Sequence, residues 1–336
     1  MNGCSSSLFR AIAAFACLWA STPAQALSCT TVGASGSVGF TIAVASNFNA
    51  PTLSLATAYA DSQGYKITVC QDSSGNLYNA IIPSNGPQYA LFFSADTTRP
   101  ALISTNYPTL VAASPANYAK GIPVFLLSPS AYAAASGNYR AVSYLTTGLT
   151  AGANAQRSDS TLPAVTNHVK VRRAPSSPPV SSLAIGNPSL APYGVAAGWV
   201  LGSDSVAYPD NMGLWASGAN VANAGTNVTA SCAGFVTGSQ WICEYDNIDY
   251  TLQAITNNRV TAGFVAYAQV CPTWAGSAYP LDQYVLFPGY NTTQAYVQLN
   301  VSDATTQARA TAFLAYLGIG TGSWNSWLTS HCYQSL

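Results

Sequence analysis

The stretch at residues 42–48 reads IAVASNF, and Ala50, Pro51 and a helix-like run follow it. It predicts a buried strand that ends at a small hydroxyl residue just before a helix begins. The pattern recurs at residues 72–77, DSSGNL, ahead of a second helix-like run. A helix start directs backbone N–H groups and the positive end of the helix dipole to one spot, which suits an anion without lysine or arginine. If both helices open on the same cleft, they would hold a small oxyanion.

The order of strand followed by helix continues along the chain and predicts an α/β fold with parallel, doubly wound sheets. We expect strands at residues 40–45, 66–70, 89–93, 123–127, 183–185 and 263–267. We expect helices at residues 50–62, 77–82, 100–104, 195–201, 247–255 and 304–317, with residues 324–332 closing the chain. Ligands on such sheets bind outside the carboxyl ends of the strands, where Ser46 and Ser74 lie.

Four segments depart from this order. Residues 27–39 are rich in Gly, Ser and Thr and predict an irregular arm. Residues 143–179 lack apolar periodicity and predict a long surface excursion, and residues 223–243 predict an insertion that holds two close cysteines. Residues 282–299 are expected to carry the chain back to the first part of the fold.

The first 26 residues have the pattern of a secretory signal peptide. Arg10 supplies positive charge, residues 11–20 form an apolar stretch too short to span a bilayer, and residues 24–26 read AQA. We expect cleavage near Ala26 and a periplasmic or otherwise extracytoplasmic protein. Lipidation of Cys29 is the alternative, but residues 26–28 form a poor lipobox.

Six cysteines remain after residue 26, and an even number in an exported protein favours disulfides. Sequence alone allows fifteen pairings of six cysteines. We prefer Cys232–Cys243, which closes a short loop, and Cys29–Cys70, which ties the entry of the first strand to the end of the second. Cys271–Cys332 is then left by elimination. A metal site is the alternative, but the sequence holds no CxxC motif and only two histidines, so we expect no bound metal.

Charged residues are sparse, at 7% of the chain, and form no basic stripe, so we expect no nucleic-acid partner. An enzyme is also disfavoured. Neither His168 nor His331 follows a predicted strand end, and the sequence has no G-x-S-x-G, P-loop or G-x-G-x-x-G motif. We therefore expect neither a catalytic residue nor a cofactor.

Six sequence blocks in order resemble the periplasmic molybdate-binding proteins that supply an ABC importer. They are ASNF with AP at residues 45–51, SSGNLY at 73–78, FSADTTRP at 93–100, LAIGNP with APYG at 183–194, NI at 247–248 and GFVA at 263–266. Each block is weak alone, but their order across residues 41–317 is specific for family and fold. The blocks are less specific for the ligand.

The resemblance implies a two-lobed clamshell in which each lobe is a doubly wound, mostly parallel sheet. Lobe one would comprise residues 27–121 and 288–336, and lobe two residues 122–287. The two lobes would close over one tetrahedral dianion and capture it without catalysis. By motif, Ser46 and Ser74 would supply hydroxyl and amide donors, and Tyr193 and Ile248 would each supply a backbone N–H group.

Two positions differ from the family pattern. Ala266 stands where some members place a ligand-binding tyrosine, and Tyr267 follows on what would be the other face of the strand. Asp72 stands where a small neutral residue is usual. Its carboxylate either faces solvent, caps the following helix, or accepts a hydrogen bond from a protonated anion such as phosphate.

We therefore expect a monomeric solute-binding protein that delivers molybdate or tungstate to the membrane subunits of an ABC importer. The alternative is a clamshell binding or signalling module for a phosphate-like or small organic anion, not coupled to molybdate import, because a fold does not settle a function.

Overall fold

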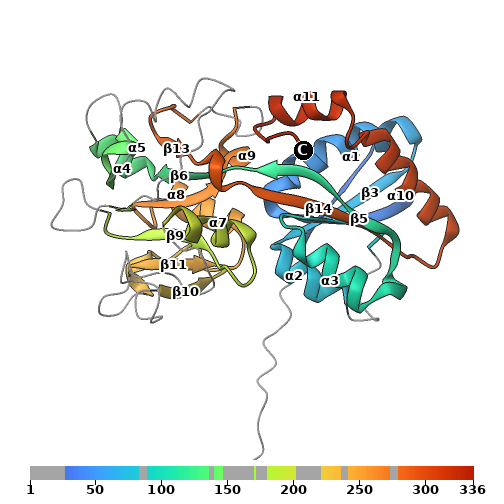
Figure 1. Ribbon diagram of the computed structural model, residues 1–336, viewed down its shortest axis with the longest axis horizontal. Coiled ribbons are helices and arrows are strands. Elements are labelled where there is room, and N and C mark those ends of the chain that lie inside the picture. Colours follow the sequence, from blue (N-terminus) through green and yellow to red (C-terminus); the bar gives the residue numbers. More distant parts are fainter. Residues whose placement is uncertain are drawn as a thin grey trace, which may run out of the picture.

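Two six-stranded mixed sheets, each covered by helices, form two lobes that lie side by side (Figure 1). The computed structural model describes residues 27–82, 89–135, 140–146, 170–171, 180–201, 221–235, 241–272 and 279–336. Within these residues, no helix has the length and apolar character needed to cross a membrane. The α/β class and the clamshell architecture are confirmed. Of the ten strand pairings in the two sheets, five are parallel, so both sheets are mixed.

The first sheet has the strand order β1-β3-β2-β4-β14-β5. Its strands are β1 (Ser28–Val32), β2 (Val38–Ala45), β3 (Lys66–Asp72), β4 (Leu91–Ser94), β5 (Val111–Gly121) and β14 (Thr292–Leu299). Strand β2 is parallel to β3 and β4, and its buried apolar residues form the centre of the lobe. The covering helices are α1 (Asn49–Gln63), α2 (Ser74–Ile81), α3 (Thr98–Asn106), α10 (Ala304–Leu317) and α11 (Gly322–Ser330), with short turns η1 (Ser46–Phe48) and η2 (Pro108–Leu110).

The second sheet has the order β10-β11-β9-β12-β6-β13. Its strands are β6 (Pro123–Leu127), β9 (Leu183–Gly186), β10 (Val221–Gly225), β11 (Ile242–Tyr245), β12 (Ala262–Ala266) and β13 (Tyr284–Leu286). The helices of this lobe are α4 (Pro129–Ala134), α5 (Arg140–Ser143), α7 (Pro192–Val200), α8 (Ile248–Thr256) and α9 (Tyr267–Val270), with η3 (Cys232–Gly234) and η4 (Pro288–Tyr290). A separate pair joins β7 (Leu145–Thr146) to β8 (Lys170–Val171).

The described chain passes between the sheets at two neighbouring places. Strand β5 of the first sheet leads into β6 of the second, and β13 of the second leads through η4 into β14 of the first. Gly121 and Thr292 are register partners on β5 and β14, so the two connections lie next to each other. We refer to these two connections as the hinge. The limits of the lobes in sequence, at residues 121/122 and 287/288, stay a prediction.

The structure corrects several expectations from the sequence. The arm at residues 27–39 contains strand β1, which pairs antiparallel with β3. The segment at residues 223–243 is not simply an insertion, because β10 and the start of β11 belong to the second sheet. Strand β5 was not predicted. Most of the excursion at residues 143–179 lies outside the described residues.

Three predicted helices begin too late in the sequence. Helices α2, α3 and α7 begin at Ser74, Thr98 and Pro192, because the turn before each already adopts helical geometry. The strand predicted to reach Tyr267 ends at Ala266, and Tyr267 begins α9 instead. Helix α10 and strand β6 have the predicted limits.

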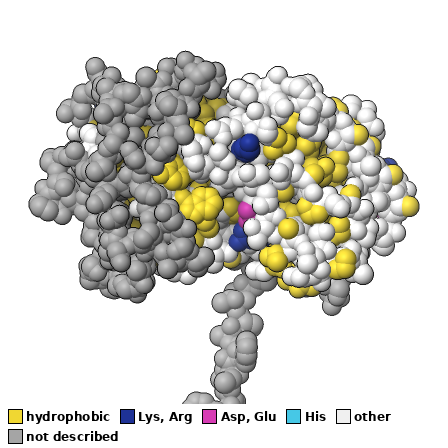
Figure 2. All heavy atoms as spheres, viewed as in Figure 1, with side chains coloured by type: hydrophobic (Ala, Val, Ile, Leu, Met, Phe, Trp, Pro, Cys, Tyr) yellow, Lys and Arg dark blue, Asp and Glu magenta, His cyan; other side chains and the backbone are white. Residues whose placement is uncertain are grey.

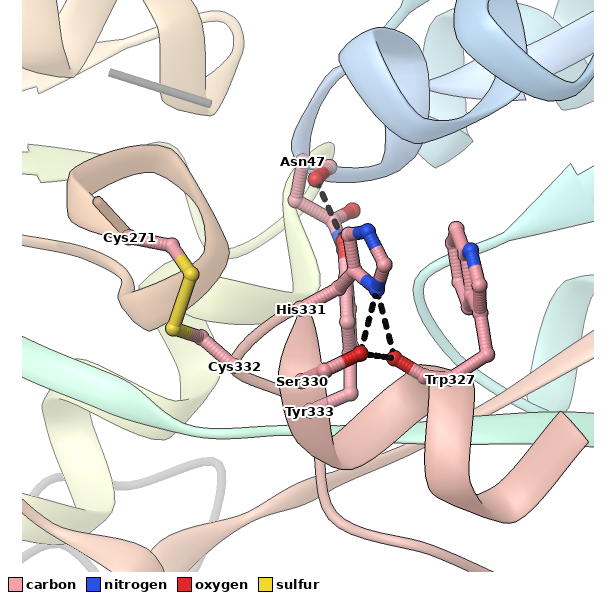
Figure 3. Close-up of a disulfide and its surroundings, with 7 residues drawn as sticks. All are labelled: Asn47, Cys271, Trp327, Ser330, His331, Cys332 and Tyr333. Atoms are coloured by element: carbon pink, nitrogen blue, oxygen red, sulfur yellow. Dashed lines mark hydrogen bonds between the residues drawn. A yellow bond between two sulfur atoms is a disulfide. The ribbon is translucent and has the colours of Figure 1, made fainter. Parts of the chain in front are cut away.

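All three preferred disulfides are present: Cys29–Cys70, Cys232–Cys243 and Cys271–Cys332. Cys29 and Cys70 are register partners on β1 and β3. Cys271 follows α9 of the second lobe, whereas Cys332 follows α11 of the first, so this disulfide joins the two lobes (Figure 3). Next to it, the Tyr333 hydroxyl donates a hydrogen bond to the carbonyl of Asn47 at 2.7 Å (Figure 3).

Candidate functional site

The carboxyl ends of three parallel strands, β2, β3 and β4, meet at one edge of the first sheet. Ala45 at the end of β2 is the register partner of Asp72 on β3, and Val44 is the partner of Phe93 on β4. Ser46, Ser73 and Ala95 therefore follow three neighbouring strand ends. The edge brings Ser46 and the start of α2 together, as the sequence predicted for a ligand site.

Ser46 is the most informative residue at this edge. It begins the η1 turn ahead of α1, and the residue is only 5% exposed. Its hydroxyl oxygen is buried and has no hydrogen-bond partner among the residues that the structure describes. Leaving a buried hydroxyl unpaired costs about 1–3 kcal/mol, so an unpaired group of this kind calls for an explanation. A ligand that accepts a hydrogen bond from Ser46 would supply one.

Ser74 is fully buried at the first position of α2. Ser73 is the N-cap of this helix, because its hydroxyl oxygen accepts a hydrogen bond from the Asn76 N–H group at 3.2 Å. Ser74 is therefore not engaged in capping. Its hydroxyl oxygen accepts from the Ala95 N–H group at 2.9 Å, which leaves the hydroxyl hydrogen to be donated to another group.

The second lobe contributes the starts of α7 and α8. Tyr193 is the second residue of α7 and Ile248 the first of α8, and both are buried. Backbone N–H groups in the first turn of a helix have no partner within the helix. Gly194 allows α7 to begin close to β9, because a Cβ atom there would lie 1.9 Å from the carbonyl oxygen of Gly186.

The Tyr193 ring points away from the helix start and toward the hinge. Its hydroxyl oxygen accepts a hydrogen bond from the Gln294 side chain on β14 at 3.1 Å. The Gln294 side-chain oxygen in turn accepts from Asn47 at 3.1 Å and from the Tyr118 hydroxyl at 2.7 Å. Burial raises the pKa of Tyr193 above its ordinary value, so the hydroxyl stays protonated. This network fixes the start of α7 relative to the hinge and to Asn47, the residue after Ser46.

Direct contacts bring the helix starts of the two lobes together. The Gly75 N–H group of α2 donates to the Leu190 carbonyl at 2.9 Å, and α8 packs against η1, which begins with Ser46. Tyr193 and Ile248 belong to one buried cluster with Ala45 and Ala95 at the strand ends of the first lobe. The structure thus places all four predicted residues at the same lobe interface.

The structure contradicts two of the three roles considered for Asp72 in the sequence. It is buried, so it does not face solvent, and Ser73 rather than Asp72 caps α2. One Asp72 carboxylate oxygen accepts from the Ser73 N–H group at 2.6 Å, the Asn76 side chain at 3.2 Å and the Asn247 side chain at 3.1 Å. Asn247 is the N-cap of α8 in the other lobe, so Asp72 links the lobes.

Two further carboxylates near Asp72 were missed in the sequence. Burial raises the pKa of Asp249 to about 6, a hydrogen bond from Gln269 at 2.7 Å works in the opposite direction, and the charge of Asp72 raises it slightly further. Burial and the Asp72 charge also raise the pKa of Asp246. The position of Asp249 in the first turn of a predicted helix was the one feature of the sequence that could have indicated its place near the site.

Tyr267 packs its ring against Tyr284, with ring centroids 6.0 Å apart.

A cavity of about 660 Å³ lies between the lobes next to these helix starts. Gly75 and Pro192, the neighbours of Ser74 and Tyr193, line it, but the four predicted residues do not. Arg99 lies in its wall, pairs with the Asp96 carboxylate, and donates a hydrogen bond to the Ser189 carbonyl at 2.7 Å. Figure 2 shows a basic and an acidic group beside a cluster of hydrophobic side chains at the waist of the molecule.

Solved structures with the same fold include several binding proteins. The Azotobacter vinelandii periplasmic molybdate-binding protein is 20% identical, with a TM-score of 0.54 over 88% of this chain and 98% of that one. The substrate-binding protein of an ABC transporter from Agrobacterium tumefaciens is 8% identical, with a TM-score of 0.53 over 90% and 82%. Periplasmic binding protein AfuA from Actinobacillus pleuropneumoniae, with fructose-6-phosphate bound, is 11% identical, with a TM-score of 0.51 over 90% and 85%.

These likenesses show a shared fold. No curated protein sequence is significantly similar to this chain. The sequence itself matches one family profile, described as bacterial extracellular solute-binding protein, over residues 40–321. Because that match spans most of the chain, the protein belongs to the bacterial extracellular solute-binding protein family.

Proposed function

We propose that the protein captures a tetrahedral oxyanion, molybdate or tungstate, between its lobes in the periplasm and delivers it to the membrane subunits of an ABC importer. The single observation that carries this proposal is the buried hydroxyl of Ser46, which has no hydrogen-bond partner among the described residues and lies in the η1 turn that packs against α8 of the other lobe. The fold of the Azotobacter molybdate-binding protein is consistent with it. The protein would bind its ligand without changing it chemically.

The donors at the lobe interface suit an anion that carries no proton. Ser46 and Ser74 offer hydroxyl hydrogens, and Tyr193 and Ile248 offer first-turn N–H groups. A hydrogen bond to a charged group contributes about 1.5–3 kcal/mol, so several together can offset the cost of dehydrating a dianion. An anion that contacts both lobes would favour the closed form, which the importer would recognise.

The buried Asp72 carboxylate favours a different ligand, one that carries a proton. Asp72 uses one oxygen for its three described hydrogen bonds, and its other oxygen makes none among the described residues. That oxygen could accept a hydrogen bond from a protonated oxygen of a phosphate-like or organic anion, whereas it would repel a fully deprotonated dianion. A phosphate-like ligand is therefore the second candidate, and Asp72 is the observation that favours it.

Calorimetric titration with molybdate, tungstate, sulfate and phosphate tests the proposal on the protein that begins at residue 27. We expect one-to-one binding of molybdate and tungstate, weakened about tenfold or more in Ser46→Ala, which loses a charge-assisted hydrogen bond. Ser54→Ala is the matched control, because Ser54 is exposed on α1.

Three results would count against the proposal. Binding of phosphate alone would favour the second candidate, and absence of binding to all four anions would refute an inorganic oxyanion ligand. Unchanged molybdate affinity in Ser46→Ala would remove this serine from the site.

A further inference from the structure

Another cavity, of about 590 Å³, lies on the second lobe at the end away from the first lobe. Its walls come from α4, which lies at that outer end (Figure 1), from the residues just before β9, from η3, and from residues 258–261 between α8 and β12. Helix α8 begins with Ile248 at the lobe interface, and its nine residues span about 13 Å before the chain reaches the cavity. The cavity is therefore separate from the proposed oxyanion site.

Arg259 is the charged residue of this cavity, and no aspartate or glutamate lines it. The Arg259 Nε atom is buried and has no hydrogen-bond partner among the described residues. No ion pair or ring contact found in the described part of the chain involves its guanidinium. A buried N–H donor without an acceptor calls for an explanation, the more so when it carries a charge. A ligand that brings a negatively charged oxygen to the guanidinium would provide one.

Several contacts fix the backbone around Arg259. Its N–H group donates to the Ala254 carbonyl at 2.8 Å, and its carbonyl accepts from the N–H group of Cys232 at 2.9 Å. Cys232 is in turn part of a disulfide. The preceding residue, Asn258, is in the left-handed conformation with φ of 56°, and its side-chain oxygen accepts from the Ser130 N–H group at 2.8 Å. An arginine on a fixed backbone binds a ligand at a lower entropic cost than one on a mobile loop.

The polar side chains that line the cavity with Arg259 can act as hydrogen-bond donors. The Ser182 hydroxyl oxygen accepts from the Thr261 N–H group at 3.2 Å, which leaves the hydroxyl hydrogen to be donated. Asn258 uses its side-chain oxygen in the described hydrogen bonds, so its amide NH₂ group remains for a ligand. Ser231 precedes η3 without capping it. Donors around a cation, with no carboxylate among them, form a site for an anionic oxygen.

The rest of the lining includes apolar side chains. Ala131, Ala134 and Val260 line the cavity, and the Tyr144 ring joins them while its hydroxyl donates to the Ala131 carbonyl at 3.1 Å. The volume lies within the range of about 300–1,000 Å³ that is typical of pockets for organic ligands. A four-oxygen inorganic anion would fill a small part of it and leave these side chains uncovered. One positive charge beside apolar groups matches one carboxylate on a carbon skeleton better than a dianion.

We propose that this cavity is a second binding site, for a small organic monocarboxylate. The carboxylate would pair with the guanidinium of Arg259, whose planar set of N–H donors matches two carboxylate oxygens. Ser182 and Asn258 would donate further hydrogen bonds to it. The carbon skeleton would lie against Ala131 and Val260. This site is independent of the anion that binds between the lobes.

The test is calorimetry and saturation-transfer NMR with the sodium salts of acetate, L-lactate, pyruvate and benzoate at up to about 20 mM, compared with the uncharged acetamide, lactamide and benzamide. The variants are Arg259→Gln and the matched control Arg309→Gln, which removes the same charge from α10 of the first lobe, where Arg309 lies over the Tyr65 ring. We expect saturable binding of at least one carboxylate, weakened about tenfold or more in Arg259→Gln and unchanged in Arg309→Gln. Should Arg259→Gln not fold, Arg259→Lys replaces it with the same expected direction, because it keeps the charge and loses the planar fork.

Each other outcome overturns the second site. No saturable binding of any carboxylate excludes the proposed ligand class, and equal binding by Arg259→Gln places the compound elsewhere. Equal affinity for the matching amide would show that the carboxylate charge plays no part. Binding of sulfate or phosphate that depends on Arg259, with no binding of a carboxylate, would assign the cavity to inorganic anions. Molybdate titration of the same Arg259→Gln protein is a separate readout, so failure here is distinguishable from failure of the oxyanion proposal.

Discussion

Replacing Asp249 by asparagine should make the protein relatively more stable as the pH rises. Asp249 lies at the lobe interface in the first turn of α8, where burial raises its pKa from 3.8 to about 6. Asparagine keeps an oxygen that can accept the hydrogen bond from Gln269 and never ionises. The variant therefore removes the titration while it preserves the geometry.

The sign of the effect follows from the two pKa values. Below pH 3.8 the carboxyl group is protonated in both states and costs the folded protein nothing. Between pH 3.8 and about 6 the unfolded chain ionises first, so the free energy of unfolding falls, and the loss is complete above the folded pKa. A shift of two units corresponds to about 3 kcal/mol at most. Because the side chain is partly exposed, we expect about 1–2 kcal/mol.

Urea denaturation of both proteins at several pH values between about 4 and 7.5 measures this difference. We expect the stability of Asp249→Asn relative to the wild type to increase by about 1–2 kcal/mol across that range. A difference that stays constant with pH would show that Asp249 ionises normally in the folded protein, and the reasoning from burial would be refuted.

Three other changes test the lobe contacts and the cross-links. Gly75→Ala should weaken molybdate binding while each lobe stays folded, because its Cβ atom would collide with Leu190 across the interface. An unchanged affinity in calorimetry would show that the lobes need not meet at this contact. Asn247→Ala should lower the free energy of unfolding by about 1–3 kcal/mol in urea titration, since it loses the cap of α8 and a donor to Asp72, and a change below about 0.5 kcal/mol would contradict both roles. The double change Cys232→Ser and Cys243→Ser should cost about 2–3 kcal/mol, measured as a lower melting temperature, and an equal melting temperature would mean that the disulfide does not form in solution.

The sequence predicted elements with strong local signals. Strand β6 is a run of five buried residues, and α10 begins after the N-cap Asp303 and ends before Gly318 in the left-handed conformation. Both elements have the predicted limits. The edge strands gave no such signal. Strand β1 is mostly exposed, and β5 contains Pro115, which sheets accept mainly on an edge strand.

In the candidate site, too, local sequence patterns predict some features and miss others. The positions of Ser46 and Ser74 follow from local strand-to-helix patterns, so the sequence placed them at the strand ends. The links around them depend on residues far apart in the chain: Asp72 and Asn247 are 175 residues apart, and Asn47 and Gln294 are 247 apart. No local pattern reports such pairs, because the fold alone brings them together.

The disulfide between Cys271 and Cys332 restricts how the lobes can rotate. Gln334, two residues beyond Cys332, pairs with Lys120 at the end of β5, and the Tyr267 N–H group, four residues before Cys271, donates a hydrogen bond to the Ile122 carbonyl at 2.8 Å. The covalent link therefore lies close to the two hinge strands and not at the mouth of the cleft. The two hinge connections and this disulfide lie near one another, so they would oppose twisting and sliding of the lobes and would permit rotation about the hinge. The cleft would open and close along a single path, so that the serines of one lobe meet the helix starts of the other in the same register at each closure.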